Sequence, residues 1–86
     1  MDRRDLELLA VADALTQRRL RVPATDAWEA VHGHQPRDQE WVELRMAILR
    51  LERAGLVESD ERLAIEVTDA GRVALEAQEV RDAGRA

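Results

Sequence analysis

The chain has no cysteine, no lysine and almost no aromatic residues. Without cysteine it can form neither a disulfide framework nor a thiolate metal site. Because Trp28 and Trp41 are its large aromatic residues, leucine, valine, isoleucine and alanine must fill most of any core. All 13 basic residues are arginine, which is a better bidentate partner than lysine for phosphate and for guanine.

Long apolar segments are also missing. No stretch approaches the roughly 20 apolar residues of a membrane span. The charged start over residues 1–5 is not followed by the apolar segment of a signal peptide. We therefore expect a cytoplasmic protein. Its 86 residues are enough for one domain with a single modest core.

Groups that carry catalysis are not assembled anywhere in the sequence. There is no glycine-rich phosphate loop, and no nucleophile stands with an activating base and an oxyanion donor. His32 and His34 form an H-x-H pair, but further ligands do not follow at a convincing spacing, and structural metal sites usually have four protein ligands. We predict exposed loop histidines, no metal, no cofactor and no enzyme activity.

Apolar residues at helical and alternating spacing predict a mainly α protein with a small β-hairpin. One domain is expected over residues 1–86, with helices over about 3–20, 25–33, 38–54 and 69–82 and a hairpin over about 56–67. The third helix has a stripe that should face the core: Trp41, Leu44, Ile48 and Leu51. The first helix has a similar stripe: Leu8, Val11, Ala12, Leu15 and, on the flank, Leu9. The acids of that helix are expected on the surface: Asp5, Glu7 and Asp13.

Helix ends are indicated by local chemistry. Gly55 should close the third helix in the left-handed conformation, and Thr68 should cap the helix that follows the hairpin. Asp26 with Glu29 has the spacing of a capping box, and Asp38 is placed to cap the third helix. Between these helices, alternation over residues 63–67 predicts a strand, residues 59–62 form the hairpin turn, and residues 21–22 can pair with the hairpin.

The last helix presents a second apolar stripe, which consists of Ala70, Val73, Ala74, Ala77 and Val80, with Leu75 to one side. Such a stripe can pack on the core of its own domain. It can equally pack against the same helix of a second copy and form a homodimer. The sequence leaves both alternatives open.

Residues 51–57 (LERAGLV) and 67–72 (VTDAGR), separated by one small hairpin, carry a family resemblance. They resemble the end of the recognition helix, the wing and the last helix of winged helix-turn-helix proteins. The bacterial regulators of the MarR and PadR kinds are the nearest in pattern. The resemblance implies a three-helix core, a two- to three-stranded wing and a C-terminal helix. It also implies binding to double-stranded DNA as a transcriptional regulator, with terminal helices that often form the dimer.

In such a domain the N-terminal part of the third helix enters the major groove. The resemblance therefore gives a set of candidate DNA-contacting residues in and around this helix and the wing: Arg37, Gln39, Arg45, Met46, Arg50 and Arg62. Arginine can bond guanine, glutamine can bond adenine, and methionine can touch a thymine methyl group. Arg18, Arg19 and Arg21 lie at the far end of the first helix, where they either complement its dipole or clamp a phosphate.

The net charge of -5 opposes this interpretation, because duplex DNA is bound mainly through contacts of basic side chains with phosphate. Residues 24–54 hold four arginines and six acids, and residues 57–67 hold one arginine and four acids. A second interpretation is therefore kept. In it the winged helix is a protein-interaction module whose acidic third helix and wing face a basic protein partner, without direct contact with DNA.

Overall fold

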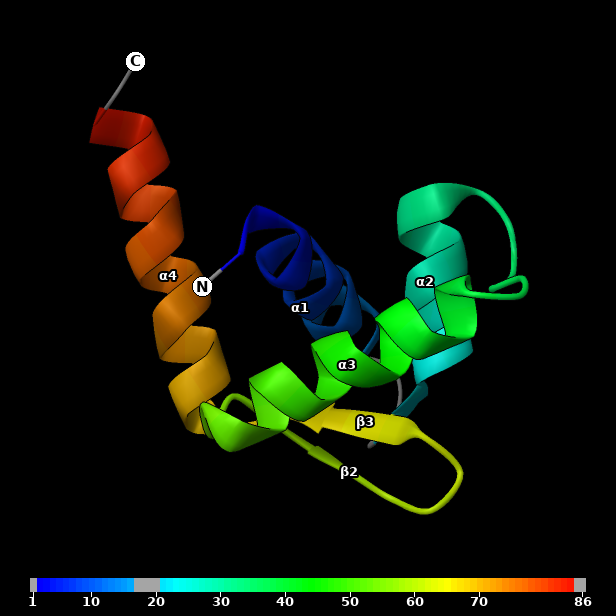
Figure 1. Ribbon diagram of the computed structural model, residues 1–86. Coiled ribbons are helices and arrows are strands. Elements are labelled where there is room, and N and C mark those ends of the chain that lie inside the picture. Colours follow the sequence, from blue (N-terminus) through cyan, green and yellow to red (C-terminus); the bar gives the residue numbers. More distant parts are fainter. Residues whose placement is uncertain (1, 17–20, 85–86) are drawn as a thin grey trace.

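The structure is a computed structural model that describes residues 2–16 and 21–84. Its elements follow in the order α1 (Arg3–Thr16), β1 (Val22–Pro23), α2 (Ala24–His32), α3 (Glu40–Arg53), β2 (Val57–Ser59), β3 (Ala64–Val67) and α4 (Asp69–Gly84). This confirms the predicted mainly helical class with a small β-sheet (Figure 1). The predicted end of the first helix, with Arg18 and Arg19, lies outside the described residues.

The sheet has three antiparallel strands in the order β1-β3-β2. Val22 pairs with Ile65, so the predicted pairing of the segment before Pro23 with the hairpin is confirmed. On the other side of β3, Val57 pairs with Val67. These four aliphatic side chains are all buried, so the sheet forms one wall of the core.

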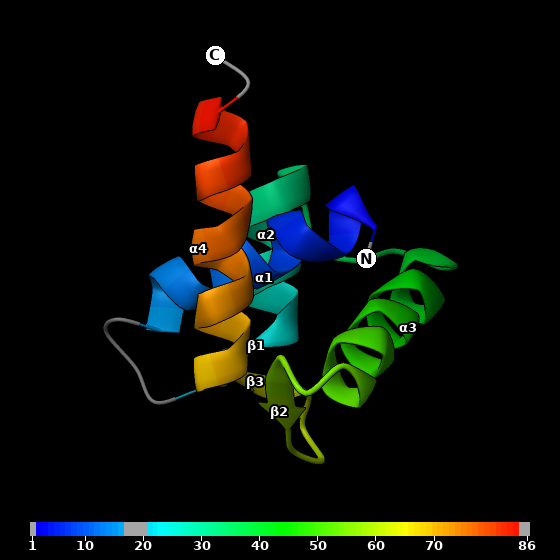
Figure 2. The same ribbon diagram turned by 90° about the vertical axis from the view of Figure 1, so that its left-hand side faces the viewer.

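Helix α1 lies between α4 and α2, and α3 crosses in front of it above the hairpin (Figure 1). The turned view places α3 and α4 on different sides of α1 (Figure 2). The helices and the sheet bury one aliphatic cluster, whose most enclosed large side chains are Leu9, Leu44, Leu51, Ile65, Val22 and Val57. No helix in the described part of the chain combines the length and the apolar character that a membrane crossing requires.

Three side chains of α1 and α3 differ from expectation. Leu15 and Trp41 were expected in the core but are exposed, whereas Asp5 was expected on the surface but is buried. The buried face of α3 includes Ala47 beside Leu44, and this moves its centre away from Trp41 in the first turn. Leu15 stands in the last turn of α1, beyond the last buried residue of that helix.

The C-terminal end of α3 is closed by the cap that the sequence predicts. Gly55 has a φ of 77°, in the left-handed region that glycine adopts without strain. Its N–H donates to the Glu52 carbonyl, and the Leu56 N–H donates to the Leu51 carbonyl, both at 2.9 Å. Leu51 and Leu56 are both buried, which gives the hydrophobic contact of a Schellman motif.

Thr68 joins this closed end of α3 to the start of α4. Its hydroxyl donates to the Gly55 carbonyl at 2.7 Å and accepts from the Gly71 N–H at 3.0 Å. The predicted cap by Thr68 is therefore confirmed. A Cβ atom added to Gly71 would lie 2.3 Å from the Leu56 carbonyl oxygen and 2.9 Å from Cγ1 of Val67. Glycine is needed here because α4 starts directly against the hairpin backbone.

The two other predicted caps are wrong. Helix α2 begins at Ala24 after Pro23, and no side chain caps it, so Asp26 lies inside its first turn. Helix α3 begins after Gln39, again without a side-chain cap. Asp38 has a φ of 49°, a conformation outside the helix. The carboxylate of Glu40 reaches back instead and accepts from the Arg37 N–H at 3.0 Å.

Helix α4 packs on α1 along one side and leaves the other side exposed. Ala74 and Leu75 are half-buried against the core, whereas Ala70, Val73 and Ala77 are exposed. An ion pair of 3.3 Å between Arg72 and Asp13 also joins α4 to α1. The predicted stripe is thus divided between the two sides of the helix, and the side chain of Val80 lies outside the described residues.

Candidate functional site

The outward side of α3 carries a row of three apolar side chains, with exposed arginines at positions 45 and 53 beside it. Val42, Met46 and Leu49 follow one another at steps of four and three, opposite the buried side chains of the helix. They are 62%, 46% and 37% exposed, and we refer to these three residues as the α3 ridge. Trp41, 42% exposed, lies beside the ridge. Among the described residues, the large exposed hydrophobic side chains outside α3 are Leu15 and Val73.

Arg50 holds α3 against α1. Its Nε donates to Oδ2 of Asp5 at 2.8 Å and its Nη2 donates to Oδ1 at 2.9 Å. Asp5 is only 2% exposed, and its hydrogen bonds with the guanidinium raise the pKa of Arg50. Arg50, a predicted DNA-contacting residue, is therefore already hydrogen-bonded to a buried carboxylate. Asp5 shares the helical row of Leu8, Leu9 and Ala12, which was the sequence signal for its burial.

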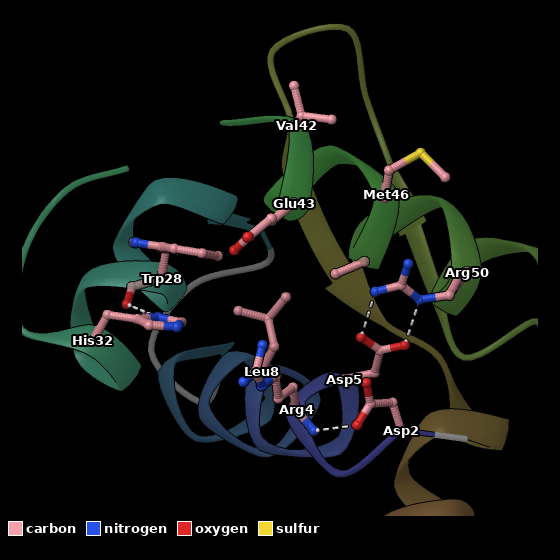
Figure 3. Close-up of a pocket in the computed structure, with 11 residues that line it drawn as sticks. Asp2, Arg4, Asp5, Leu8, Trp28, His32, Val42, Glu43, Met46 and Arg50 are labelled. Atoms are coloured by element: carbon pink, nitrogen blue, oxygen red, sulfur yellow. Dashed lines mark hydrogen bonds and ion pairs between the residues drawn. The ribbon is translucent and has the colours of Figure 1, made fainter. Parts of the chain in front are cut away.

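A hollow of about 360 Å³ opens beside the ridge, between the N-terminal end of α1, the C-terminal end of α2 and α3 (Figure 3). Its charged lining residues are Asp2, Arg4, Asp5, Glu43 and Arg50, with the imidazole of His32. Its apolar lining residues are Leu8, Trp28, Val42, Met46 and Ala47. The hollow therefore combines apolar walls with charged groups of both signs.

Trp28 and His32 form the α2 side of the hollow. Their rings are stacked, with centroids 3.8 Å apart, and Nδ1 of His32 donates to the Trp28 carbonyl oxygen at 3.2 Å. Trp28 is buried, and its indole Nε1 has no hydrogen-bond partner among the described residues. These contacts hold both rings in place, one helical turn apart.

Glu43 projects from α3 into the same hollow. Its carboxylate is directed toward Trp28, whereas Val42 projects outward at the rim (Figure 3). Glu43 is exposed, and no ion pair or hydrogen bond of its side chain occurs within the described residues. It is therefore a carboxylate available to a ligand.

The remaining candidate DNA-contacting residues lie around the ridge and at the tip of the β2–β3 hairpin. Arg37, Gln39, Arg45 and Arg62 are exposed. The guanidinium groups of these three arginines form no ion pair within the described residues. Met46 is part of the ridge. The structure thus places these residues on the surface, whereas the guanidinium group of Arg50 is bound to Asp5 of α1.

The tip of the β2–β3 hairpin is fixed by Asp60. Its Oδ1 accepts from the N–H groups of Arg62 and Ala64, both at 2.9 Å, and its Oδ2 lies 3.4 Å from Arg21. These interactions, above all the hydrogen bond from Ala64, lower the pKa of Asp60. Leu63 completes the turn with a φ of 59°. Arg21, a candidate phosphate clamp, pairs with Asp60 instead.

The two histidines of the H-x-H pair have different contacts. His32 is stacked on Trp28, and Nε2 of His34 lies 3.7 Å from a carboxylate oxygen of Glu40. Their ring centroids are 6.3 Å apart. In the part of the chain that the structure describes, no three metal-ligating side chains come together. The contacts of both rings are accounted for by neighbouring residues.

The site therefore consists of the apolar ridge, the adjoining hollow and a few exposed arginines. The surrounding fold is mainly helical with a small three-stranded antiparallel sheet, which is compatible with a β wing. The chain was compared with protein-family models, with curated proteins and with solved structures, and none of them matches it. Its function must be inferred from the chemistry of this surface.

Proposed function

We propose that the chain is a small winged-helix domain that binds a protein partner through the α3 ridge. The supporting observation is the exposure of Val42, Met46 and Leu49 along the outward side of α3. A helix that reads DNA presents polar groups to base edges and cationic groups to phosphates. Aliphatic side chains gain free energy mainly when another apolar surface removes them from water.

Three charged groups support the same proposal, whereas the exposed Arg37 and Arg45 support the second candidate below. Arg50 is paired with Asp5, and Arg21 is paired with Asp60, so each of these two guanidinium groups already has a carboxylate partner. Glu43 adds an unpaired negative charge beside the ridge. Phosphates would be repelled by this carboxylate, whereas a basic protein surface would be attracted.

The residue types also suit a protein interface. Tryptophan and methionine are enriched in such interfaces, and tryptophan is frequent among the side chains that dominate binding energy. Trp41 and Met46 are both partly exposed on α3. The partner expected from this chemistry is an amphipathic helix whose apolar side covers the ridge and whose flanks carry lysine or arginine.

This proposal is tested by selecting helical peptides from a displayed random library against the immobilised chain. Selected peptides should combine aliphatic residues at helical spacing with basic flanking residues. Met46→Glu should weaken their binding by more than about tenfold, because a charge is then placed in the apolar contact. Val73→Glu is the matched control, since Val73 is exposed on α4. The proposal would be contradicted if the selected peptides bound Met46→Glu with the same affinity as the wild type and Val73→Glu.

A second candidate function is DNA binding by a homodimeric transcriptional regulator. It is favoured by Arg37, Arg45 and Arg62, which are exposed without ion pairs in the described residues. In this proposal the exposed side of α4, with Val73, pairs two copies. The two third helices would then lie about 34 Å apart, as successive major grooves require.

The second candidate is tested with mixed genomic DNA fragments at low and moderate salt. A phosphate-binding surface gives an affinity that falls steeply as salt rises. Arg45→Ala should then weaken binding to all fragments and reduce the salt slope by about one. Absence of binding at low salt would remove this candidate and leave the protein-binding proposal in place.

A further inference from the structure

We propose that the hollow beside α3 receives one alkylated guanidinium or ammonium group, supplied by an arginine or lysine side chain of the partner. This inference rests on the proposed function, because the partner that covers the α3 ridge also covers the mouth of the hollow. Val42 and Met46 belong to both surfaces. A side chain from a helix lying on the ridge can therefore enter the hollow directly.

The charge of the lining selects a cation. It holds three carboxylates, Asp2, Asp5 and Glu43, and two guanidinium groups, Arg4 and Arg50. Asp5 and Arg50 neutralise each other through two hydrogen bonds. Two carboxylates, Asp2 and Glu43, then remain with one guanidinium group, Arg4. The lining therefore has an excess of one negative charge and favours a single positive charge in the ligand.

Glu43 is the carboxylate that receives this cation. Asp2 accepts a hydrogen bond from the backbone N–H of Arg4 at 3.3 Å, whereas the side chain of Glu43 has no partner within the described residues. Its carboxylate is directed into the hollow, toward Trp28 (Figure 3). A guanidinium or ammonium group can donate to it there, and such charge-assisted hydrogen bonds are among the stronger ones.

The apolar walls suit the alkyl part of the same side chain. Leu8, Met46 and Ala47 are among the apolar lining residues of the hollow. Arginine and lysine commonly bury their methylene groups along apolar surface while the charged end reaches a polar partner. The volume of about 360 Å³ is near the lower end of ligand sites, roughly 300 to 1,000 Å³, and is adequate for one side chain.

The test uses side-chain analogues of equal length. n-Butylguanidinium and n-pentylammonium are titrated into the full chain, with n-pentanoate and 1-pentanol as the anionic and neutral analogues. Binding is followed by the indole N–H resonance of Trp28, which a Trp41→Phe sample distinguishes from that of Trp41. The two cations should shift this resonance saturably in the millimolar range, and the anion and the alcohol should not. Equal or stronger binding of pentanoate would overturn the proposal.

Glu43→Gln separates the role of the charge from the shape of the hollow. It should weaken binding of the cations by at least about tenfold, as expected for a lost hydrogen bond between charged groups. Glu79→Gln is the matched control, because Glu79 is exposed on α4, and it should leave the affinity unchanged. A circular dichroism spectrum and melting temperature like those of the wild type show that Glu43→Gln remains folded. Unchanged cation binding in Glu43→Gln would also overturn the proposal.

The cation titration and the peptide selection test the two proposals separately. If neither cation binds while selected peptides still depend on Met46, the assignment of the hollow is wrong and the proposed function stands. If the cations bind through Glu43 while no peptide depends on Met46, the hollow is a cation site and the protein-binding proposal is wrong.

Discussion

The two ends of α3 differ in how they are held. At the C-terminal end, Gly55, Leu56, Thr68 and Gly71 close the helix with backbone and hydroxyl hydrogen bonds and a tight backbone contact. At the N-terminal end the cap residue Gln39 makes no side-chain hydrogen bond, and the hollow begins beside this end, at Val42 and Glu43. The comparison indicates that one end of α3 stabilises the fold while the other end and the ridge remain available for binding.

The largest expected effect is on the buried side of α3. Leu51 is fully buried at the closed end, so Leu51→Ala should lower the free energy of unfolding by about 2 to 5 kcal/mol. Met46→Ala, on the exposed side, should change it by less than about 0.5 kcal/mol. Urea unfolding of both variants checks this comparison. A similar loss in both would mean that the ridge is part of the core.

Gly71→Ala should have the next largest effect. The added methyl group would meet the Leu56 carbonyl and Val67, so the start of α4 must shift away from the hairpin. Overpacking of this kind costs about 1 to 3 kcal/mol. Thermal unfolding measures the loss, and Ala70→Gly on the exposed side of α4 is the control for a helix propensity change alone. A melting temperature equal to that of the wild type would contradict the close contact.

Thr68→Ala removes the hydroxyl that joins the two helices. The Gly71 N–H would lose its acceptor and the Gly55 carbonyl would lose a donor. Loss of a cap costs about 0.5 to 2 kcal/mol. Thr68→Ser keeps the hydroxyl and should recover most of the lost stability in urea unfolding. If serine were no better than alanine, the threonine would act through its methyl group.

The smallest expected effect is the acid sensitivity of the hairpin tip. Because folding lowers the pKa of Asp60, its contribution to stability is present above the usual carboxyl pKa of 3.8. That contribution is lost as the pH falls through the lower, folded-state value. Asp60→Ala should therefore be less stable than the wild type at neutral pH, and the difference should shrink in acid.

Urea unfolding between pH 7 and pH 2 measures this difference. Glu61→Ala is the control for removing one negative charge from the same turn. A difference between Asp60→Ala and the wild type that stays constant across this range would mean that the carboxylate does not hold the turn.

The closed end of α3 was predictable because its chemistry is local. Gly55 and Thr68 form hydrogen bonds with backbone groups a few residues away, and their residue types indicate the caps directly. The hydrogen bond between Thr68 and Gly55 spans a longer distance in the sequence. The pairing of Val22 was also predictable from its position before Pro23. Asp26 and Asp38 have suitable residue types, but each stands two positions from the first residue of its helix, so their spacing gave false caps.

The open side was less predictable because it depends on how distant elements pack. Arg50 is neutralised by Asp5, which lies 45 positions earlier in the sequence. Trp41 falls outside the core because the side of α3 that packs on the rest of the domain consists of Leu44, Ala47, Ile48 and Leu51. The hollow needs residues from three helices at once, and no spacing within one helix indicates it.

The most direct test of the account is the affinity of a peptide selected on the wild-type chain for the wild type and for Met46→Glu. Met46 lies in the middle of the α3 ridge, and its substitution leaves the buried side of the helix intact. A protein-binding ridge predicts a loss of more than about tenfold, with an unchanged affinity for Val73→Glu. Equal affinity for the wild type and Met46→Glu would contradict the central claim that α3 binds its partner through this ridge.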